Sequence, residues 1–527
     1  MSIRVRFAPS PTGQVHIGNI RAAIFNWLYA RHEKGKFILR IEDTDLERST
    51  PEAIATLLDI LKWLKIDYDE EPLYQTTQMK KHLAAAKKLL EDGNAYKDNK
   101  GDKGEAILFR IPWDAEMVPG VKIAGPQEFK LHPEAPLTIS NKGLHYATIS
   151  KKGKSIPESA CLAGFKDLKV LDANQGVLFD IKDHIDAILN KDAVFTLDNA
   201  DKMQFTRRTV SYDDKVKGIM TKPLDSLKDF VIVRSDGSPI FHLANVIDDI
   251  TQGITHIIRG DDHVENTFKH IFLFYCLGAT LPIYGHLPMI VNAAGKPYSK
   301  RDGDAFVGDF RTKGFLPDAL FNYLSLLGWS PGDDREKMTR EELVEAFTLE
   351  RCLRASSQMD IQKLTNLNGL YIAEMPLDKF IELARIYSKD ESWIKDQSDE
   401  MFKTVCAFMQ SRVKTMTDVS LWKYFFVEIP DYDENVCKKQ FKKPEICDAL
   451  NKLLPILQKT VPFNAADIEK AIAHVSEQNE IPHGKLNQPL RAAVTGTNIG
   501  AGIYETMELL GKECCCQRLE FAKRFFQ

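Results

Sequence analysis

The sequence lacks any long apolar run. A membrane-spanning helix needs roughly 18 consecutive apolar residues, whereas the most apolar stretch here, Ile271 to Leu281, is shorter and ends at Pro282. The N-terminus begins with a charged segment and lacks the basic and apolar regions of a signal peptide. We therefore expect a cytoplasmic protein with no membrane segment.

Paired cysteines are also lacking. The chain has nine cysteines and no Cys-x-x-Cys pair, although Cys514, Cys515 and Cys516 are adjacent. Scattered cysteines of this kind indicate reduced thiols rather than disulfides. Because no second pair of ligands lies nearby in the sequence, we expect the three adjacent thiols to be buried or partly exposed on a helix rather than to hold a metal.

No excess of positive charge marks the chain as a nucleic-acid binder. The net charge is −4, and this total neither indicates nor excludes a nucleic-acid partner. Hydrophobic residues make up 44% and charged residues 27% of the sequence, which is typical of a globular protein. The length of 527 residues predicts about three to five modules.

A loop rich in proline and glycine lies near the N-terminus, from Arg6 to Asn19. The residues before it alternate basic and apolar and predict a strand, and the apolar spacing from Ile20 predicts a helix. A loop between a strand and a helix directs backbone N–H groups and the helix N-terminus at a bound anion. A lone His-x-Gly is usually only a turn with a surface histidine, so His16 needs a second phosphate-directed element to be significant.

Residues 295–303 supply that second element. This short loop begins and ends with glycine and contains Lys296, Lys300 and Arg301. A lysine on a mobile loop can stabilise phosphate oxygens as negative charge builds in a transition state.

Strands and helices alternate in the first part of the chain, which predicts a parallel, doubly wound sheet. One predicted strand, residues 36–41, ends at Glu42-Asp43-Thr44-Asp45, and the carboxyl ends of parallel strands are where such sheets bind ligands. The helix after it should begin with Thr50 as N-cap and Pro51. We expect the sheet to resume with strands over residues 230–233, 241–249, 256–259 and 288–291.

The middle and the end of the chain differ from this pattern. Residues 98–225 contain short apolar runs between polar turns and predict an inserted α+β module, with one amphipathic helix from Ile181 to Leu189. Beyond Leu316 the spacing is helical throughout. The predicted fold class is therefore α/β, a Rossmann-like doubly wound parallel sheet split by an inserted α+β module and followed by all-α C-terminal domains.

The two loops resemble the HIGH and KMSKS motifs of class I aminoacyl-tRNA synthetases. Residues 6–31, the segment Ile41 to Asp45 and the Ser-Lys-Arg-Asp-Gly of the second loop are most similar to glutamyl-tRNA synthetases of the bacterial and organellar type. The resemblance covers about residues 1–97, 209–375 and 484–496. It implies a ligase that forms glutamyl-adenylate from glutamate and ATP and then transfers glutamate to the 3′-terminal adenosine of tRNA(Glu).

The resemblance also implies a role for each part of the chain. The expected domains are 1–97 and 226–315 as the two halves of the catalytic domain, 98–225 as the module that binds the acceptor arm, 316–375 as a helical domain that contacts the tRNA stem, and 376–527 as the anticodon-binding domain.

The family's functional residues can be placed on this chain. The resemblance implies His16 and Lys300 as catalytic residues, with Mg²⁺ accompanying ATP. It implies that glutamate is bound by Arg6, Ala8, Ser10, Glu42, Phe241, Asn245 and Arg259. It implies that ATP is bound by Pro9, Ser10, Thr12, Gly13, His16, Gly18, Asn19, Asp262, Ser299, Lys300 and Arg301.

Several departures from the family pattern stand out. Pro297 and Tyr298 occupy the start of the lysine motif, and Phe241 replaces a common tyrosine, which removes one hydroxyl. Lys97 to Gly104 contains no Cys or His where many relatives have a zinc loop, so we expect no structural zinc. Residues 113–206 are longer than the connection in relatives, and we expect them to be an add-on whose deletion leaves a folded protein.

Alternatives remain open at this point. The enzyme could be non-discriminating and also charge tRNA(Gln) with glutamate, because anticodon reading depends on a few side chains, such as those near Arg412. A glutaminyl enzyme fits the N-terminal motif and the helical tail less well. A non-catalytic tRNA-binding homologue would not need His16, Glu42, Arg259 and Lys300. The family expectation for the oligomeric state is a monomer.

Overall fold

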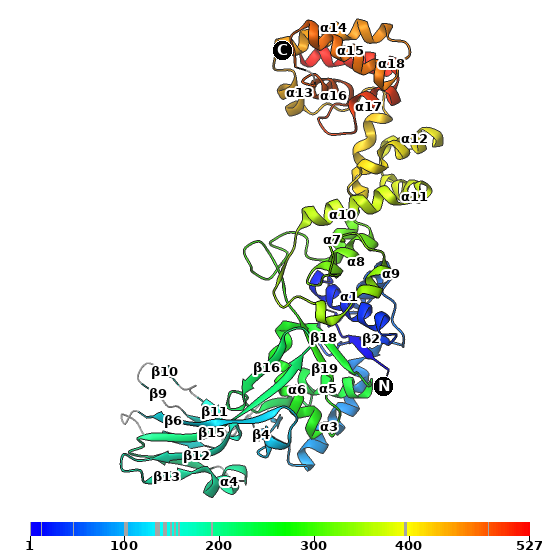
Figure 1. The fold of residues 1–527 in the computed structure, drawn as a ribbon. Coiled ribbons are helices and arrows are strands. Elements are labelled where there is room, and N and C mark those ends of the chain that lie inside the picture. Colours follow the sequence, from blue (N-terminus) through cyan, green and yellow to red (C-terminus); the bar gives the residue numbers. More distant parts are fainter. Residues whose placement is uncertain are drawn as a thin grey trace. The chain divides into compact units, whose positions relative to one another are not determined.

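The computed structural model forms two compact units, one of Met1–Asp309 with Phe321–Met359 and one of Phe310–Leu320 with Asp360–Gln527. Both units are drawn in Figure 1, coloured along the sequence. Within these units the structure describes residues 2–11, 13–45, 47–99, 104–131, 137–140, 145–147, 150–151, 154–155, 159–190, 193–394, 398–482 and 484–526.

The first unit contains a parallel sheet built from distant parts of the sequence. Its strands are β1 (Arg4–Phe7), β2 (Lys36–Ile41), β3 (Leu73–Tyr74), β18 (His256–Gly260) and β19 (Ile283–Leu287). β1 pairs in parallel with β2, β2 with β3, and β18 with β19. The backbone N–H of Thr255 donates to the carbonyl of Arg4 (3.0 Å), which places β1 beside β18. The parallel strands β3-β2-β1 thus lie beside the parallel pair β18-β19, and the predicted parallel arrangement is confirmed.

Helices connect these strands, and their starts follow the sequence signals. Thr50 caps α2, its hydroxyl accepting from the N–H of Ala53 (3.3 Å), and Pro51 occupies the first turn as predicted. The helices of this part are α1 (Ile17–His32), α2 (Pro51–Trp63), α3 (Met79–Glu91), α5 (Phe241–Thr251) and α6 (Val264–Cys276).

The strand predicted over residues 241–249 is wrong, because this segment forms helix α5. Its buried residues include Leu243, Val246 and Ile247, which have helical spacing. Apolar residues in the same run also alternate in part, and β-branched residues favour strands, so the local pattern fitted both structures.

Two other predicted strands form but lie outside the parallel sheet. β17 (Phe230–Val233) pairs antiparallel with β5 (Glu105–Phe109), which pairs antiparallel with β4 (Ala95–Asn99). Only Ile290–Val291 of the segment 288–291 is a strand, β20, and it pairs with β21 (Ser357–Gln358).

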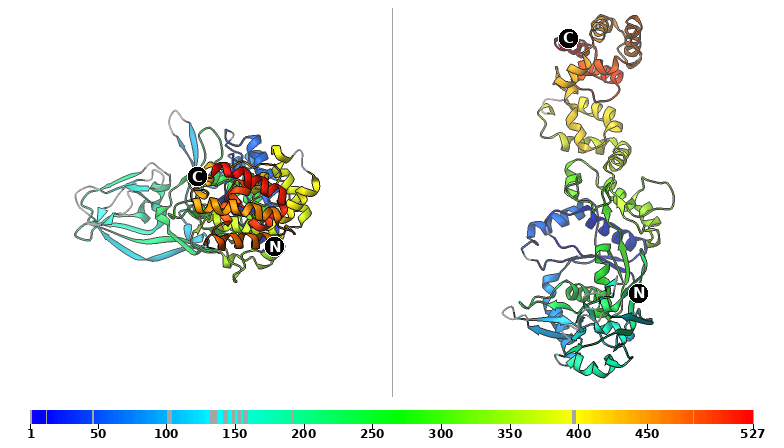
Figure 2. Two further views of the ribbon diagram at one scale, coloured as in Figure 1. Left: turned by 90° about the horizontal axis from the view of Figure 1, so that it is seen from above. Right: turned by 90° about the vertical axis from the view of Figure 1, so that its left-hand side faces the viewer.

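The inserted module is built around one long strand, β15 (Lys202–Asp214). β15 pairs antiparallel with β6 (Val121–Lys130), β12 (Phe165–Leu171) and β16 (Gly218–Pro223). Its last residue, Asp214, also lies beside Tyr284 of β19 in parallel. β15 therefore belongs to the inserted module and to the parallel sheet at once, and the module's strands extend away from that sheet within the first unit (Figure 2). The other elements are β7 (Leu137–Ser140), β8 (His145–Ala147), β9 (Ser150–Lys151), β10 (Lys154–Ser155), β11 (Ser159–Cys161), β13 (Val177–Asp180), α4 (Ile181–Asn190) and β14 (Val194–Leu197).

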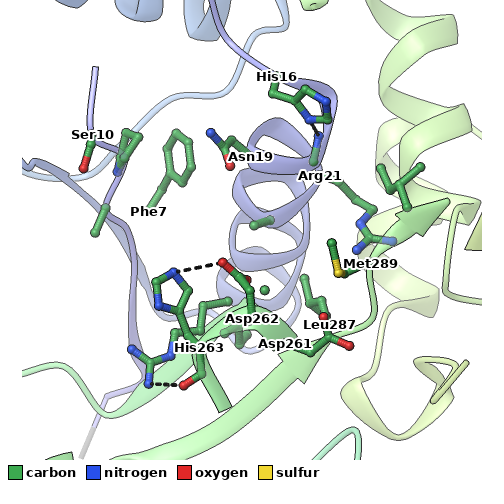
Figure 3. Close-up of a pocket in the computed structure, with 18 of the residues that line it drawn as sticks. Phe7, Ser10, His16, Asn19, Arg21, Asp261, Asp262, His263, Leu287 and Met289 are labelled. Carbon is green, nitrogen blue, oxygen red and sulfur yellow. Dashed lines mark hydrogen bonds and ion pairs between the residues drawn. The ribbon is translucent and has the colours of Figure 1, made fainter. Parts of the chain in front are cut away.

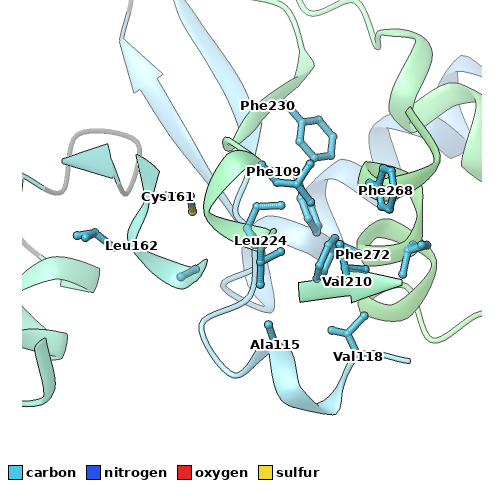
Figure 4. Packing of buried hydrophobic residues seen from close by; sticks show 14 of the residues in the cluster. Phe109, Ala115, Val118, Cys161, Leu162, Val210, Leu224, Phe230, Phe268 and Phe272 are labelled. Carbon is cyan, nitrogen blue, oxygen red and sulfur yellow. The ribbon is translucent and has the colours of Figure 1, made fainter. Parts of the chain in front are cut away.

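The hydrophobic core of the first unit includes residues of the inserted segment. Phe165 and Phe205 pack edge to face in it, with ring centres 5.0 Å apart. Both belong to the same buried cluster as Phe109 and Phe230, part of which is drawn in Figure 4. This sharing argues against the expectation that removal of residues 113–206 leaves a folded protein, because the deletion would expose apolar surface of the rest.

The Phe165→Ala variant tests this shared core. Phe165 is almost fully buried, so we expect the change to lower the free energy of unfolding by about 3–5 kcal/mol. Urea unfolding followed by circular dichroism measures the loss. Phe195→Ala is the control, because Phe195 lies in the same module and is only partly buried. A loss for Phe165→Ala well below this range would show that the segment is not part of the main core.

The second unit is all helical among its described residues, apart from connecting segments. It buries two hydrophobic clusters, one around Trp422 and one around Leu450. Cys514, Cys515 and Cys516 lie on α18, with Cys515 buried and the other two partly exposed, as expected. The helices beyond residue 300 are α7 (Val307–Thr312), α8 (Pro317–Leu326), α9 (Arg340–Ala346), α10 (Ile361–Glu374), α11 (Leu377–Ser388), α12 (Asp399–Met409), α13 (Glu434–Gln440), α14 (Pro444–Lys459), α15 (Ala465–Gln478), α16 (Asn487–Thr495), α17 (Ile503–Leu510) and α18 (Lys512–Ala522).

The predicted fold class is confirmed, including the split sheet and the helical C-terminal part. None of the helices in the described residues combines the length and the apolar character needed to cross a membrane.

Candidate active site

A cavity of about 550 Å³ opens at the carboxyl ends of β1, β2 and β18 (Figure 3). Its wall comes from the loop before α1, the first turn of that helix, the end of β2, helix α5 and the segments after β18 and β19. Twelve residues predicted from the sequence line it: Arg6, Ala8, Pro9, Ser10, His16, Gly18, Asn19, Glu42, Phe241, Asn245, Arg259 and Asp262.

Four other predicted residues that the structure describes do not line this cavity. Gly13 has a φ of +109°, which glycine adopts without strain, and it lies in the turn before α1. Ser299, Lys300 and Arg301 lie on the lysine loop outside the lining. Thr12 lies outside the described residues.

His16 is the N-cap of α1. Its Nδ1 accepts a hydrogen bond from the backbone N–H of Gly18 (3.0 Å), so the proton of the neutral ring is on Nε2. Burial lowers the pKa of His16, and a weaker opposing contribution comes from the backbone of Tyr298. A Cβ at Gly18 would lie 3.2 Å from Nδ1, so glycine allows the cap to form closely. The histidine is therefore held as a neutral Nε2–H donor.

The lysine loop is joined to the loop of His16. The backbone N–H of Ile17 donates to the carbonyl of Ala305 (2.9 Å), and the N–H of Val307 donates to the carbonyl of Val15 (3.0 Å). Between them, the ring of Phe306 lies 6.1 Å from the His16 ring, and the ring centre of Phe306 is 5.8 Å from Lys300 Nζ. The two motifs are far apart in the sequence and adjacent in the fold.

The tip of the lysine loop is closed by Asp302. Ser299 donates to its Oδ2 from the backbone N–H (2.9 Å) and from the hydroxyl (2.8 Å), and Asn292 donates to Oδ1 (2.7 Å). The hydrogen bond from Asn292, followed by that from Ser299, lowers the pKa of Asp302. The turn that carries Lys300 is therefore held by an ionised carboxylate.

One end of the cavity is a buried ionic cluster. Asp249 accepts from Arg6 Nε (3.0 Å) and Arg40 (2.7 Å), and Glu42 accepts from Asn245 Nδ2 (2.9 Å). Burial raises the pKa of Glu42, although Arg40 and Arg6 oppose the shift. Burial would also raise the pKa of Asp249, but the two arginines together hold it below its ordinary value. The described hydrogen bonds of Arg6 use only Nε, and the residue lines the cavity.

Arg259 completes the cationic wall. Its NH2 donates to Thr267 Oγ1 (2.7 Å) and to the carbonyl of His263 (3.3 Å), and its Nε donates to His286 Nε2 (3.3 Å). Its NH1 is buried and has no hydrogen-bond partner in the part of the chain that the structure describes. Burial lowers the pKa of Arg259 to about 10, so the group remains a cation at neutral pH. An unpaired, buried guanidinium nitrogen is suited to a carboxylate ligand.

Aromatic side chains form the wall at Phe241. Its ring stacks on His263, with ring centres 5.5 Å apart and an interplanar angle of 28°. His242 Nδ1 lies 3.2 Å from His270 Nε2, and burial lowers the pKa of His242 to about 4. His242 is absent from the cavity lining, so it acts in packing. The wall presents no hydroxyl at position 241.

Several lining residues were not anticipated from the sequence. Arg21 is buried on α1 and donates to the carbonyls of Leu327 (3.0 Å) and Pro288. The sequence did contain a signal for Arg21, because it is a charged residue between apolar positions of a buried helix. The sequence contained no such signal for other lining residues. They lie in segments that follow strands, and the strands that pack beside these are distant in the sequence: Asp261, His263, Met289 and Tyr298.

A second cavity, of about 490 Å³, lies in the second unit. Trp422, Tyr424 and Met409 line it together with basic side chains, among them Arg412, which the sequence had suggested. The Tyr424 hydroxyl is buried without a partner in the described segments. Aromatic faces beside cations are typical of sites that stack nucleobases.

The chain matches two family models. The catalytic domain of class I tRNA synthetases (E and Q) matches residues 2–104 and 202–366, and an anticodon-binding domain matches residues 379–523.

Individual relatives are similar along the whole chain. Glutamate–tRNA ligase 2 of Thermoanaerobacter pseudethanolicus is 35% identical over 530 residues, with 100% of this chain and 98% of the relative covered. The glutamate–tRNA ligase of Legionella pneumophila is 35% identical over 523 residues, covering 99% and 98%. A crystal structure of a glutamate–tRNA ligase from Elizabethkingia meningosepticum, in complex with its amino acid, has a TM-score of 0.69 at 24% identity and covers 100% of both chains, which indicates the same fold.

Proposed function

The chain belongs to the class I tRNA synthetases for glutamate and glutamine, and on this basis we propose how its cavity joins glutamate to tRNA. The enzyme is a glutamate–tRNA ligase used in protein biosynthesis. Glutamate and ATP give glutamyl-adenylate and pyrophosphate, and the 3′-terminal adenosine of tRNA(Glu) then takes the glutamyl group and releases AMP. The observation that carries this conclusion is the full-length similarity to named glutamate–tRNA ligases.

Glutamate binds at the ionic end of the cavity. Three buried arginines, Arg6, Arg40 and Arg259, lie near two carboxylates, Glu42 and Asp249. A glutamate molecule has two carboxylates and one ammonium group, so it can pair both with the arginines and with Glu42. We assign its side-chain carboxylate to Arg6 and Arg259, and its ammonium group to Glu42, held in place by Asn245. The backbone around Ala8, with Ser10 and Phe241, forms the rest of the pocket.

ATP binds beside it, over the N-terminus of α1. His16 Nε2–H supplies a donor to the phosphates, and the first turn of α1 around Gly18 and Asn19 places the positive end of the helix dipole beside them, where it favours anions. Pro9, Ser10, Thr12, Gly13 and Asp262 complete the ATP site in this proposal. The α-carboxylate of glutamate then attacks the α-phosphate in line, and pyrophosphate leaves. No side chain serves as nucleophile, so the rate depends on positioning and on charge stabilisation.

Lys300 acts as a cation that moves to the phosphates. In the structure it lies over Phe306, beside the His16 loop, so a rearrangement of the turn 299–302 brings it and Arg301 to the triphosphate. We propose that Mg²⁺ arrives with ATP, because it prefers oxygen ligands and keeps several waters. Among the described residues, no group of three or more His, Cys, Asp or Glu side chains is arranged to hold a metal ion.

The second unit selects the tRNA. We propose that the cavity around Trp422 and Tyr424 receives a base of the anticodon, with Arg412 at its edge. Discrimination between tRNA(Glu) and tRNA(Gln) then depends on this cavity, and charging of tRNA(Gln) is the alternative. We also propose that the enzyme acts as a monomer in the cytoplasm, where tRNA is charged.

Aminoacylation with glutamate and with glutamine, each on purified tRNA(Glu) and tRNA(Gln), tests the function. Glutamate on tRNA(Glu) alone would mean a discriminating enzyme. Glutamate on both tRNAs would mean a non-discriminating enzyme that depends on a later amidation of the product. The absence of any product, together with retained tRNA binding, would favour a non-catalytic homologue and overturn the proposal.

Arg412→Ala tests the anticodon cavity. Loss of one stacking or charged contact to a base costs about 1–3 kcal/mol, so we expect the KM for tRNA(Glu) to rise about 5- to 150-fold. The KM values for glutamate and ATP should not change. Steady-state charging at varied tRNA concentration measures this, and Arg524→Ala, a basic residue outside the cavity, is the control. Equal effects of both variants would contradict a specific role for the cavity.

A further inference from the structure

Three buried side chains lie behind Arg259 and do not line the active-site cavity. They are Asp214 at the end of β15, Thr267 on α6 and His286 on β19, and each is at most 1% exposed. His286 Nδ1 lies 2.5 Å from Asp214 Oδ2. His286 Nε2 lies 3.3 Å from Arg259 Nε and 3.0 Å from Thr267 Oγ1. A continuous chain of hydrogen bonds therefore runs from the inserted module to Arg259.

The protons in this chain have one consistent arrangement. Arginine has only donors, so His286 Nε2 must accept from Arg259 Nε. The proton of the neutral imidazole is then on Nδ1, where Asp214 accepts it. Burial would raise the pKa of Asp214, but the hydrogen bond from His286 and the backbone N–H donors hold it below its ordinary value. Asp214 is thus an ionised acceptor that fixes the tautomer of His286.

The chain also fixes the direction of the guanidinium group. Nε and NH2 are held by His286, Thr267 and the carbonyl of His263, and the ring centre of Tyr284 lies 5.7 Å from the guanidinium carbon. NH1 is the guanidinium nitrogen that none of these contacts involves. Without them, a long arginine side chain would sample several rotamers and direct NH1 only part of the time.

We propose that Asp214, His286 and Thr267 are positioning residues that direct Arg259 NH1 at the side-chain carboxylate of glutamate and thereby set the selectivity against glutamine. The inference rests on the proposed function of the cavity. A glutamine amide has no charge, and its NH₂ group would face a guanidinium donor, so a correctly directed NH1 favours the carboxylate.

Asp214 also supports the backbone, since the N–H groups of Val216 (2.9 Å) and Lys217 (2.8 Å) donate to it. A test must therefore separate positioning from structural support. In Asp214→Asn, the amide oxygen can still accept from the backbone, whereas the NH₂ group faces His286 Nδ1. The proton of the His286 imidazole then moves to Nε2, so that two donors, His286 Nε2–H and Arg259 Nε–H, face each other.

The measurement is the charging of tRNA(Glu) by Asp214→Asn, with glutamine as a competitive inhibitor. Loss of the partner that orients a metal ligand typically costs about 10- to 100-fold, and we take the same factor for the partner that orients Arg259. We expect the KM for glutamate to rise by that factor, while the KM for ATP and kcat change less than about twofold. The ratio of the glutamine Ki to the glutamate KM should fall at least about tenfold. Asp225→Asn is the matched control, because Asp225 is a buried carboxylate paired with Arg207 away from the cavity.

Thr267 provides a second pair of variants if Asp214→Asn does not fold. Thr267→Val keeps the shape and removes the hydroxyl, and it should lower the selectivity ratio, whereas Thr267→Ser should restore it. An unchanged ratio in Asp214→Asn and Thr267→Val, or an equal loss in Asp225→Asn, would overturn the positioning role. If the wild-type enzyme fails to charge glutamate at all, the proposed function is wrong instead.

Discussion

Replacement of Arg259 by leucine should raise the KM for glutamate by about 30- to 1,000-fold. Removal of one partner of a buried, hydrogen-bonded charge pair costs roughly 2–4 kcal/mol, and every 1.36 kcal/mol is a factor of ten. The free NH1 of Arg259 is the group that would bind the substrate carboxylate, so the cost falls on glutamate and not on ATP. Steady-state charging at varied glutamate and at varied ATP measures the two KM values separately.

Arg208→Leu is the control for this variant. Arg208 is a buried arginine of the inserted module that donates to the carbonyls of Ala163 (3.0 Å) and Phe165 (2.7 Å), away from the cavity. It should lower stability and leave the KM for glutamate unchanged. An Arg259→Leu enzyme with a normal KM for glutamate would show that Arg6 alone binds the carboxylate.

Replacement of Lys300 by alanine should slow glutamate activation by about 100- to 1,000-fold and leave the affinity for tRNA nearly unchanged. Removal of one preorganised charge contact to a transition state costs about 2.7–4 kcal/mol. Lys300 lies over Phe306 and outside the cavity, so its contribution requires movement to the phosphates and is made mainly in the transition state. Single-turnover formation of glutamyl-adenylate with tRNA bound measures the rate.

Lys296→Ala and Arg301→Ala are the matched variants on the same loop. Lys296 lies one place before Pro297, so it tests whether the altered start of the motif has transferred the role. A normal rate in Lys300→Ala with a slow rate in either of the other variants would assign the charge to that residue.

The sequence predicted the local parts of the fold well. The cap at Thr50, the loop before α1 and most helices beyond residue 316 depend on residues close together in the chain. The prediction of a strand over residues 241–249 was wrong because Leu243, Val246 and Ile247 fit a helix, while the same short run fits a buried strand. The partner of β17 could not be predicted, since pairing with β5 joins segments more than a hundred residues apart.

For the candidate site too, the sequence predicted what depends on local residues and not what depends on distant parts of the chain. The predicted residues were found because the motifs that carry them are specific in type and spacing. Twelve of them meet at one cavity, seven from the loop between Arg6 and Asn19 and five from other segments, while those of the lysine loop lie outside it. Arg21 and Tyr298 were not assigned to the site, although Arg21 is a charged residue among apolar positions of α1 and Tyr298 lies at the start of the lysine motif. The hydrogen bond between Ile17 and Ala305 joins distant parts of the chain, so the adjacency of the two loops became visible only in the fold.

Because β15 belongs both to the inserted module and to the parallel sheet, it limits where relatives can be recombined. The catalytic family match stops at residue 104 and resumes at 202, the first residue of β15, so residues 105–201 look like an exchangeable cassette. A crossover at Lys202 would separate β15 from its native partners β6 and β12. Its 13 residues span roughly 40 Å at about 3.3 Å each, so a hybrid would have to form new strand pairing along this whole length. Viable hybrids should therefore inherit β15 with the module and with its other antiparallel partner, β16, and cross over after Pro223.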